Sequence, residues 1–381
     1  MKRFIAAEVY LPKSNFERWA VIACDQFAED KSYWNRVTQQ VGDVPSTLKF
    51  IIPEAFLDEP AHYSIGTIRE NMVQTLLRDN MRKLPRGGVF VKRQISSGIR
   101  CGFLVEIDLE RFSFDFREDA TVVASEAIIP NRLSIRIEMR EQLPLEFSHT
   151  MLFFEDEEDR IVKDLTSTPL EQLYSFELME FGGRIEGYFL TEAHLKHLDE
   201  TIPSPIFVAD GNHSLAAAKL YWDKIKSQLS EEQYCTHPAR FHLVEMVNIY
   251  SESVKFYPIH RLISQIDEEH FCVYFSKEMP CKREKNLITP HYDDAFAIIE
   301  KTDSLMERYV SKFGGRIEYV HDELELKKKS VSHAIGIKLN PLKKDEVLSH
   351  LKHGELLPKK TFSIGKATDK RYYLEGRSLL F

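Results

Sequence analysis

The chain alternates short apolar runs with polar turns and with segments of helical periodicity, a pattern typical of proteins that mix helices and strands. We predict buried strands at the short apolar runs, which include residues 21–24, 89–91, 102–107 and 150–154. Other segments are predicted to be helical, among them residues 30–41, 67–82 and 170–178. The pattern as a whole predicts an α/β fold of the mixed α+β kind.

The amino-acid composition changes about two thirds of the way along the chain, after which Lys, Glu and Asp are more frequent. We therefore predict a core domain over residues 1–265 and a smaller carboxyl-terminal α+β domain over residues 266–381. The tail at residues 356–365 is rich in polar residues and in residues common in turns. It is either a surface loop or a strap that returns to the functional site with Lys359 or Lys360 near an anion.

One polar turn concentrates more chemistry than its surroundings. The apolar residues 206–209 predict a buried strand, and the alanine-rich residues 215–219 predict a helix. The turn between them, residues 210–214, holds an acid, a glycine, an amide, a histidine and a hydroxyl. In α/β sheets ligands bind where strands end and helices begin, because free N–H groups and the helix dipole face outward there. The same residue types also cap helices, so a plain helix cap is the alternative interpretation.

Each residue of this turn suits a step of phosphate chemistry. Asp210 is a candidate to bind Mg²⁺ or to orient His213, and His213 is a candidate to position a phosphate or to transfer a proton. The backbone N–H groups from Gly211 through Asn212 to Ser214 are candidates to cradle the phosphate at the helix start.

Two further clusters supply candidates for the same site. Glu126 is a candidate general base, and Arg132 a candidate anion ligand, because guanidinium forks suit phosphate. The alternative is that the arginines of this stretch form surface ion pairs. His149 enters a predicted buried strand and is either a structural histidine or a substrate-binding group.

Several familiar catalytic motifs are missing from the chain. There is no G-x-x-x-x-G-K-[ST], no G-x-G-x-x-G, no G-x-S-x-G and no H-E-x-x-H. These absences argue against Walker-type NTPases, Rossmann dehydrogenases, α/β-hydrolases and zincins.

Composition narrows the class of partner. A net charge of -8 over 381 residues argues against nucleic acid, which needs a concentrated basic face. Five scattered cysteines without C-x-x-C spacing fit a reduced, cytoplasmic compartment and no zinc site. No apolar run reaches the roughly 20 residues that span a bilayer, so no membrane partner is expected.

The motif at residues 209–219 resembles the hallmark of the domain-of-unknown-function ten-fifteen family, in its D-G-N-H-S form. Further stretches that resemble this family lie along nearly the whole chain, at residues 23–27, 33–34, 41–48, 145–149, 178–183, 357–363 and 370–373. Many members carry D-G-H-H-R instead, so their residue roles transfer only to Asp210, Gly211 and His213. The family's T-E-G-T and P-P-R elements correspond to residues 125–132, which lack the glycine and one proline.

This resemblance implies a fold and an activity. The family is similar to the ParB/sulfiredoxin superfamily, which includes free serine kinases as well as ParB partition proteins. The resemblance therefore implies a ParB/sulfiredoxin-like mixed-sheet core. It also implies a phosphotransferase or phosphatase that uses ATP or ADP with Mg²⁺ and acts on a small metabolite, for which serine or phosphoserine is suggested. Asp25 and His149 are then expected at the substrate, and Lys360 at the phosphate. The alternative is a ParB-like nucleotide-binding or regulatory module without catalysis, and a homodimer stays open.

Overall fold

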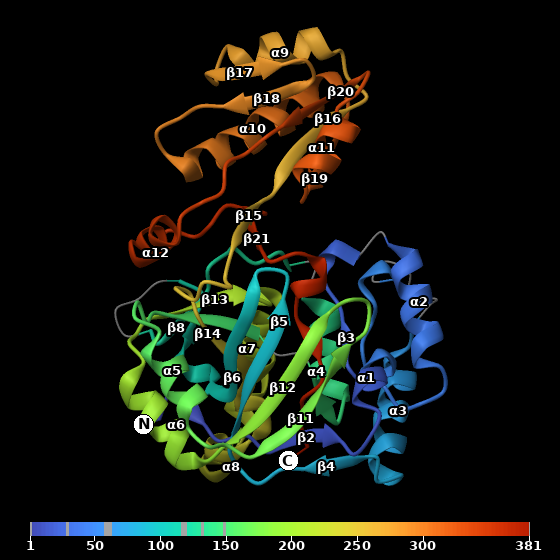
Figure 1. Cartoon of the computed structure of the whole chain (residues 1–381), viewed down its shortest axis with the longest axis vertical. Helices are drawn as coiled ribbons and strands as arrows, with labels where there is room; N and C mark the ends of the chain where they lie inside the picture. The colour runs from blue at the N-terminus through green and yellow to red at the C-terminus, as the bar shows by residue number, and fades with distance from the viewer. Residues whose placement is uncertain are drawn as a thin grey trace. The chain divides into compact units, whose positions relative to one another are not determined.

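The structure, a computed structural model, describes residues 2–27, 30–56, 63–115, 120–130, 133–147 and 150–380, with the side chains of Asp25 and Glu54 left out. The chain forms two compact units (Figure 1). Unit 1 comprises Met1–Val254 and Gly365–Phe381, and unit 2 comprises Lys255–Ile364. The structure thus places residues 255–265 in unit 2 and residues 365–381 in unit 1, whereas the sequence pattern predicts residues 255–265 in the core domain and residues 365–381 in the smaller domain.

Unit 1 is organised by a large mixed sheet, which has ten strands within the described residues. Along the sheet the order is β11 (Gln172–Leu178), β12 (Gly183–Leu190), β5 (Gly88–Ile95), β6 (Gly98–Asp108), β14 (Phe241–Asn248), β10 (Thr150–Phe154), β13 (Ile206–Asp210), β8 (Val122–Val123) and β7 (Phe112–Ser113), while β1 (Phe4–Ile5) also pairs with β6. β10 runs parallel to β14 and antiparallel to β13. The predicted mixed α/β fold is confirmed.

Successive side chains of the central strands belong alternately to two hydrophobic cores. In β5, Val89 and Val91 belong to one core and Phe90 to the other. In β6, Leu104 belongs to the first of these cores and Phe103 to the second. Because side chains alternate across a strand, both faces of this sheet are buried, which explains why these strands read as continuous apolar runs.

The helices of unit 1 connect and cover these strands (Figure 1). They are α1 (Phe16–Trp19), α2 (Lys31–Val41), α3 (Ile65–Leu77), α4 (Ser134–Gln142), α5 (Arg160–Ser167), α6 (Glu192–Thr201), α7 (Asn212–Ile225) and α8 (Glu231–Thr236). α7 packs against β10 and α4, and this contact fixes the start of α7 at the sheet.

The last segment of the chain is tied to unit 1 by short strands. β22 (Tyr372–Tyr373) pairs with β3 (Val21–Ile22). β23 (Gly376–Ser378) lies between β2 (Val9–Pro12) and β9 (Leu145–Glu146), and β4 (Met81–Lys83) pairs with the other edge of β2. These pairings explain why residues 365–381 belong to unit 1.

Unit 2 is a smaller α+β assembly. Its main sheet has the order β17 (Cys281–Glu284), β18 (Leu287–Pro290), β20 (Ala334–Ile337), β16 (His260–Ser264) and β19 (Arg316–Val320), and β15 (Phe256–Pro258) pairs separately with β21 (Phe362–Ile364). Its helices are α9 (Glu268–Ser276), α10 (Ala295–Phe313), α11 (Glu323–Lys329) and α12 (Lys344–Lys352). Among the described residues of both units, no helix is long and apolar enough to cross a membrane.

Candidate functional site

The predicted polar turn joins β13 to α7, as the sequence pattern indicated. Ile206 and Val208 are buried in β13, and residues 216–218 are buried in α7, where alanine's small side chain permits close packing. Gly211 is the N-cap residue of α7, and its φ of 90° is a left-handed conformation that favours glycine. The amino end of α7 therefore lies at the carboxyl end of β13, a buried strand.

Two side chains of the turn hold a neighbouring loop. Asn212 Nδ2 donates to the carbonyl oxygen of Glu126 at 2.7 Å, and the N–H of Ile129 donates to His213 Nε2 at 3.1 Å. This bond occupies His213 Nε2, so the histidine helps to hold the loop that carries Glu126 and Ile129. The Asn212 amide is likewise committed to the loop rather than directed at a phosphate.

The predicted cradle of N–H groups is smaller than the sequence suggested. The N–H of Ser214 donates to the carbonyl oxygen of Gly211 at 2.9 Å, so it is used inside the helix. The N–H groups of Asn212 and His213 precede it, and the first turn of a helix offers them no acceptor within α7. An anion at this end of the helix would therefore meet these two groups.

Two basic residues from the end of the chain reach the same turn. Lys370 Nζ lies 3.9 Å from Asp210 Oδ2, and Arg371 Nε lies 3.9 Å from Asp210 Oδ1. The Arg371 guanidinium covers Gly211 so closely that a Cβ on that glycine would lie 2.7 Å from Arg371 Nη1. The turn thus combines one carboxylate, two cations and a helix amino terminus.

The position of Lys370 and Arg371 is fixed by a fully buried arginine in β5. Arg93 donates through Nη2 to the carbonyl oxygen of Thr368 and through Nη1 to that of Lys370, both at 2.6 Å. Burial, with the nearby charge of Arg100, lowers the pKa of Arg93 to about 9, so the guanidinium stays charged at neutral pH. β22 anchors the chain directly after Arg371, which leaves the basic pair little freedom.

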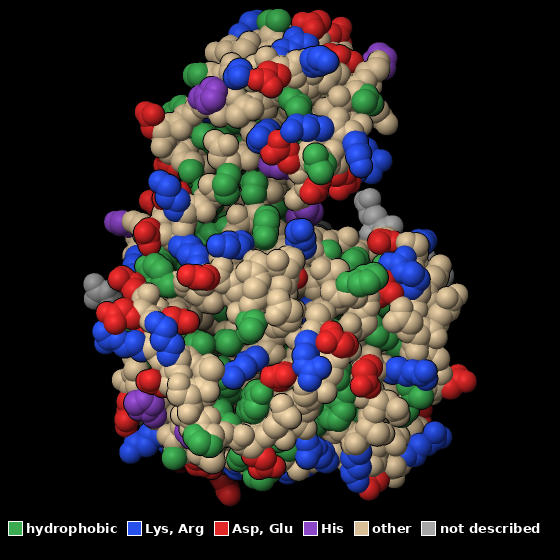
Figure 2. All heavy atoms as spheres, viewed as in Figure 1, with side chains coloured by type: hydrophobic (Ala, Val, Ile, Leu, Met, Phe, Trp, Pro, Cys, Tyr) green, Lys and Arg blue, Asp and Glu red, His purple; other side chains and the backbone are tan. Residues whose placement is uncertain are grey.

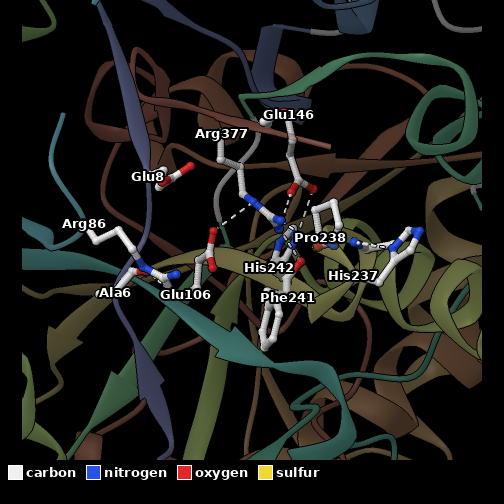
Figure 3. A network of polar contacts seen from close by, with 12 residues as sticks. Ala6, Glu8, Arg86, Glu106, Glu146, His237, Pro238, Phe241, His242 and Arg377 are labelled. Atoms are coloured by element: carbon white, nitrogen blue, oxygen red, sulfur yellow. Dashed lines mark hydrogen bonds and ion pairs between the residues drawn. The ribbon is translucent and has the colours of Figure 1, made fainter. Parts of the chain in front are cut away.

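A buried polar network surrounds Glu146 and His242 (Figure 3), and Thr150 links it to the turn. Thr150 Oγ1 is 3.5 Å from the carbonyl oxygen of Gly211 and 2.9 Å from His242 Nε2. His242 Nδ1 lies 3.0 Å from the carboxylate of Glu146, which also pairs with Arg140. The turn is therefore connected to the interior by a continuous chain of polar contacts.

A second arginine completes this network. Arg377 Nη1 lies 3.4 Å from Glu146 Oε2, and its Nε lies 3.0 Å from Glu106 Oε1. Burial alone would raise the pKa of Glu146, but the charges of Arg140 and Arg377 and the hydrogen bond with His242 lower it to about 2. Burial lowers the pKa of His242, so its imidazole is neutral near pH 7 while Glu146 stays ionised.

The structure brings together only part of the predicted site. Asp210, Gly211, Asn212, His213 and Ser214 are contiguous, and Asn212 and His213 draw the loop that carries Glu126 to this end of α7. Arg132 and His149 lie outside the described residues, and Asp25 is described only by its backbone, which opens a short 3-10 helix. Lys360 belongs to unit 2, where its carbonyl oxygen accepts from Arg261 at 3.0 Å.

Sequence reasoning missed the basic pair and the buried network. Lys370 and Arg371 lie in a stretch, residues 370–373, that the sequence singles out only by its resemblance to the family, and their adjacent positive charges are the signal that the sequence offers. They lie beyond the tail at residues 356–365 and belong to unit 1. Thr150 and His242 sit within apolar strands, and their pattern gave no signal of a shared contact.

The residues present provide a single carboxylate for a metal at the turn. Among the described residues, no group of three or more His, Cys, Asp or Glu side chains is arranged to hold a metal ion. Asp210 also has two cations nearby. This donor set fits Mg²⁺ only if a ligand's phosphates supply further oxygens, which is the usual way that Mg²⁺ binds beside one or two carboxylates.

Comparison with known proteins gives the chain a family. The sequence profile described as "Protein of unknown function (DUF1015)" matches residues 6–354. The chain belongs to this family. The predicted membership of this DUF1015 protein is thereby confirmed, while among curated proteins none matches its sequence.

Solved structures that resemble this DUF1015 protein do so at low identity. A free serine kinase in complex with AMP has 13% identity and a TM-score of 0.40, covering 72% of this chain and 92% of that chain. A conserved hypothetical protein from Pyrococcus furiosus has 13% identity and a TM-score of 0.35, covering 71% and 90%. SbnI with a C-terminal truncation, from Staphylococcus aureus, has 11% identity and a TM-score of 0.38, covering 68% and 82%.

The surface charge of the DUF1015 protein is mixed on the face drawn in Figure 2. Basic and acidic side chains are interspersed over the described residues of this face, in both units.

Proposed function

We propose that the DUF1015 protein binds the phosphates of ADP or ATP at the amino end of α7 and transfers a phosphoryl group to or from a small hydroxyl metabolite. The observation that carries this proposal is the convergence of Lys370 and Arg371 on the Asp210–Gly211 turn. Two cations and the N–H groups of a helix start offer several donors to one anion, which suits phosphate.

The roles of the individual residues follow from their contacts. Arg371 and Lys370 neutralise phosphate charge, and the Arg93 clamp holds both in place, so little rearrangement is needed when the anion binds. Asn212 and His213 act as positioning residues, because both fix the loop of Glu126 at the site. Glu126 is the proposed acid/base, and Asp210 is the residue that would hold a nucleotide-borne Mg²⁺, which would neutralise phosphate charge.

Serine and phosphoserine are the acceptor and donor that the family resemblance suggests, and they define the first substrates to test. Each is a small hydroxyl or phosphate metabolite of the kind that the proposal requires.

Titration with nucleotides tests the binding step. ADP and ATP with Mg²⁺ are expected to raise the melting temperature of the full chain, because a ligand at 100 times its Kd stabilises the folded state by about 2.7 kcal/mol. Adenosine is the matched control, because it keeps the base and ribose and lacks the phosphates. If ADP has no effect at millimolar concentration, or if adenosine stabilises the chain as much as ADP does, the phosphate site is wrong.

Phosphorus NMR tests the transfer step in the same samples. With ADP or ATP, Mg²⁺ and a panel of small hydroxyl acids that includes L-serine, a new phosphomonoester signal is expected. Nucleotide binding without transfer to or from any member of the panel would contradict the catalytic part of the proposal and favour a nucleotide-binding module.

A further inference from the structure

Unit 1 contains a fully buried carboxyl group that lacks a counterion. Glu375 lies between β22 and β23 and is 0% exposed. Its Oε1 accepts a hydrogen bond from the hydroxyl of Tyr174 in β11, whereas its Oε2 has no hydrogen-bond partner among the described residues. None of the ion pairs within the described part of the chain includes Glu375. The phosphate site does not use this group.

The surroundings of Glu375 are closed to water. The Tyr174 ring covers Gly187 of β12 so closely that a Cβ on that glycine would lie 2.6 Å from the Tyr174 hydroxyl oxygen. Leu374, the preceding residue, is also fully buried, and its carbonyl oxygen accepts from Trp19 Nε1 at 3.0 Å. A carboxylate in such a place would be an uncompensated buried charge, so the carboxyl group keeps its proton.

The titratable groups around Glu375 also disfavour its charge. They come from three strands and comprise Tyr174 in β11, Tyr372 in β22 and Glu245 in β14. Burial raises the pKa of Glu375 to about 8, and the negative charge of Glu245 adds to this rise, while the hydrogen bond from Tyr174 opposes it. Burial also raises the pKa of both tyrosines, so they remain neutral.

The arginines of the neighbouring strands are committed to other acceptors. These are Arg93 with carbonyl oxygens of residues 368–370, Arg100 with Glu245 at 3.6 Å, and Arg377 with Glu106 and Glu146. If Glu375 lost its proton, its charge would have to reach water, which requires the chain around it to move.

We propose that Glu375 is a proton-dependent lock on the last segment of the chain, residues 366–378. While the carboxyl group carries its proton, the segment stays buried against unit 1, and when the proton is lost the segment loosens. The same segment carries Lys370 and Arg371, so its release would withdraw the basic pair from the Asp210 turn. Only this consequence for the turn rests on the proposed function.

Urea denaturation at pH 5.5 and 7.5 tests the lock in the full chain. All three tryptophans are buried in unit 1, so their fluorescence reports its unfolding. Since the pKa of Glu375 is raised from 4.5 to about 8 in the folded chain, the stability it contributes is complete below pH 4.5 and is lost as the pH rises through 8. Relative to Glu375→Gln, which cannot titrate, the unfolding equilibrium constant of the unmodified chain is expected to rise by about thirtyfold or more between the two pH values.

Two further variants control this comparison. Glu375→Leu also removes the titration and is expected to give the same rise when it replaces Glu375→Gln as the reference. Glu177→Gln removes a carboxylate of the same strand as Tyr174 that is 65% exposed, and the ratio between the unmodified chain and this variant is expected to stay constant. A constant ratio for Glu375→Gln, or an equal rise for Glu177→Gln, overturns the proposal.

Hydrogen exchange at pH 8 places the effect in the segment. The amides of residues 372–378 are expected to exchange at least tenfold faster in the unmodified chain than in Glu375→Gln, while those of β16 in unit 2 exchange equally in both. Equal exchange of residues 372–378 in the two chains would show that Glu375 does not control the segment. Neither measurement uses a nucleotide, so a failure to bind ADP would contradict the proposed function and not the lock.

Discussion

Glu146→Gln is expected to lower the free energy of unfolding by about 3–5 kcal/mol, because removing one partner of a buried ion pair leaves the other charge uncompensated. The Glu146 carboxylate contacts Arg140 and Arg377, whose side chains are 5% and 3% exposed. It also lies 3.0 Å from His242 Nδ1, which links the network to Thr150 and the turn. Urea denaturation followed by circular dichroism at pH 7 measures the loss.

Glu158→Gln is the matched control, because Glu158 pairs with Arg160 in an exposed ion pair. Such surface pairs contribute about 0–1 kcal/mol, so this variant is expected to unfold almost as the unmodified chain does. If Glu146→Gln costs no more than Glu158→Gln, the buried network does not stabilise unit 1 in the way that its contacts indicate.

The pH dependence of the same variant provides a second check. The pKa of Glu146 is lowered from 4.5 to about 2, so its contribution to stability is present above pH 4.5 and is lost as the pH falls towards 2. The difference in unfolding free energy between the unmodified chain and Glu146→Gln is therefore expected to shrink over this range. A difference that stays constant down to pH 2 would show that the charge of Glu146 is not what matters.

Local patterns predicted most of the fold, and failed where two periodicities compete. The helix predicted at residues 30–41 is α2, because its buried residues recur at helical spacing. The helix predicted at residues 170–178 is wrong: this segment is β11, in which Tyr174, Phe176 and Leu178 are buried while the residues between them are more exposed. That alternation has a period of two, and pairing with β12 decides in favour of the strand.

The candidate site could be predicted only as far as it is contiguous in sequence. The order of strand, polar turn and small-residue helix placed the Asp210 turn correctly between β13 and α7. Lys370 and Arg371 lie 160 residues further along the chain than the turn. Short paired strands hold this last segment in place, and no local pattern specifies their pairing. The contacts that commit His213 and Asn212 to the loop at Glu126 are likewise tertiary, so the sequence could not distinguish positioning residues from phosphate ligands.

Gly211→Ala is expected to weaken ADP binding at least tenfold, which corresponds to about 1.4 kcal/mol. A Cβ at this position would lie 2.7 Å from Arg371 Nη1 and 3.3 Å from Thr150 Oγ1. Because Arg371 is a long side chain, its guanidinium can move aside at little cost in stability, but it then leaves the position where phosphate is proposed to bind. Calorimetric titration with ADP and Mg²⁺ measures the change.

Gly314→Ala separates this effect from backbone strain. Gly314 also has a positive φ, of 79° against 90° for Gly211, with ψ of 179° against 22°, and a Cβ there would meet nothing within 4 Å. Both variants are expected to lose stability because alanine is strained at a positive φ, and only Gly211→Ala is expected to lose ADP binding. Equal ADP affinity in the two variants would remove Arg371 from the phosphate site.

The most direct test of the central claim is a crystal structure of the full chain with ADP and Mg²⁺. We expect a phosphate group within hydrogen-bond distance of the Arg371 guanidinium and of the backbone N–H groups of Asn212 and His213, with Lys370 nearby. Nucleotide density elsewhere in the chain, or phosphates directed away from the amino end of α7, would contradict the proposed phosphate site.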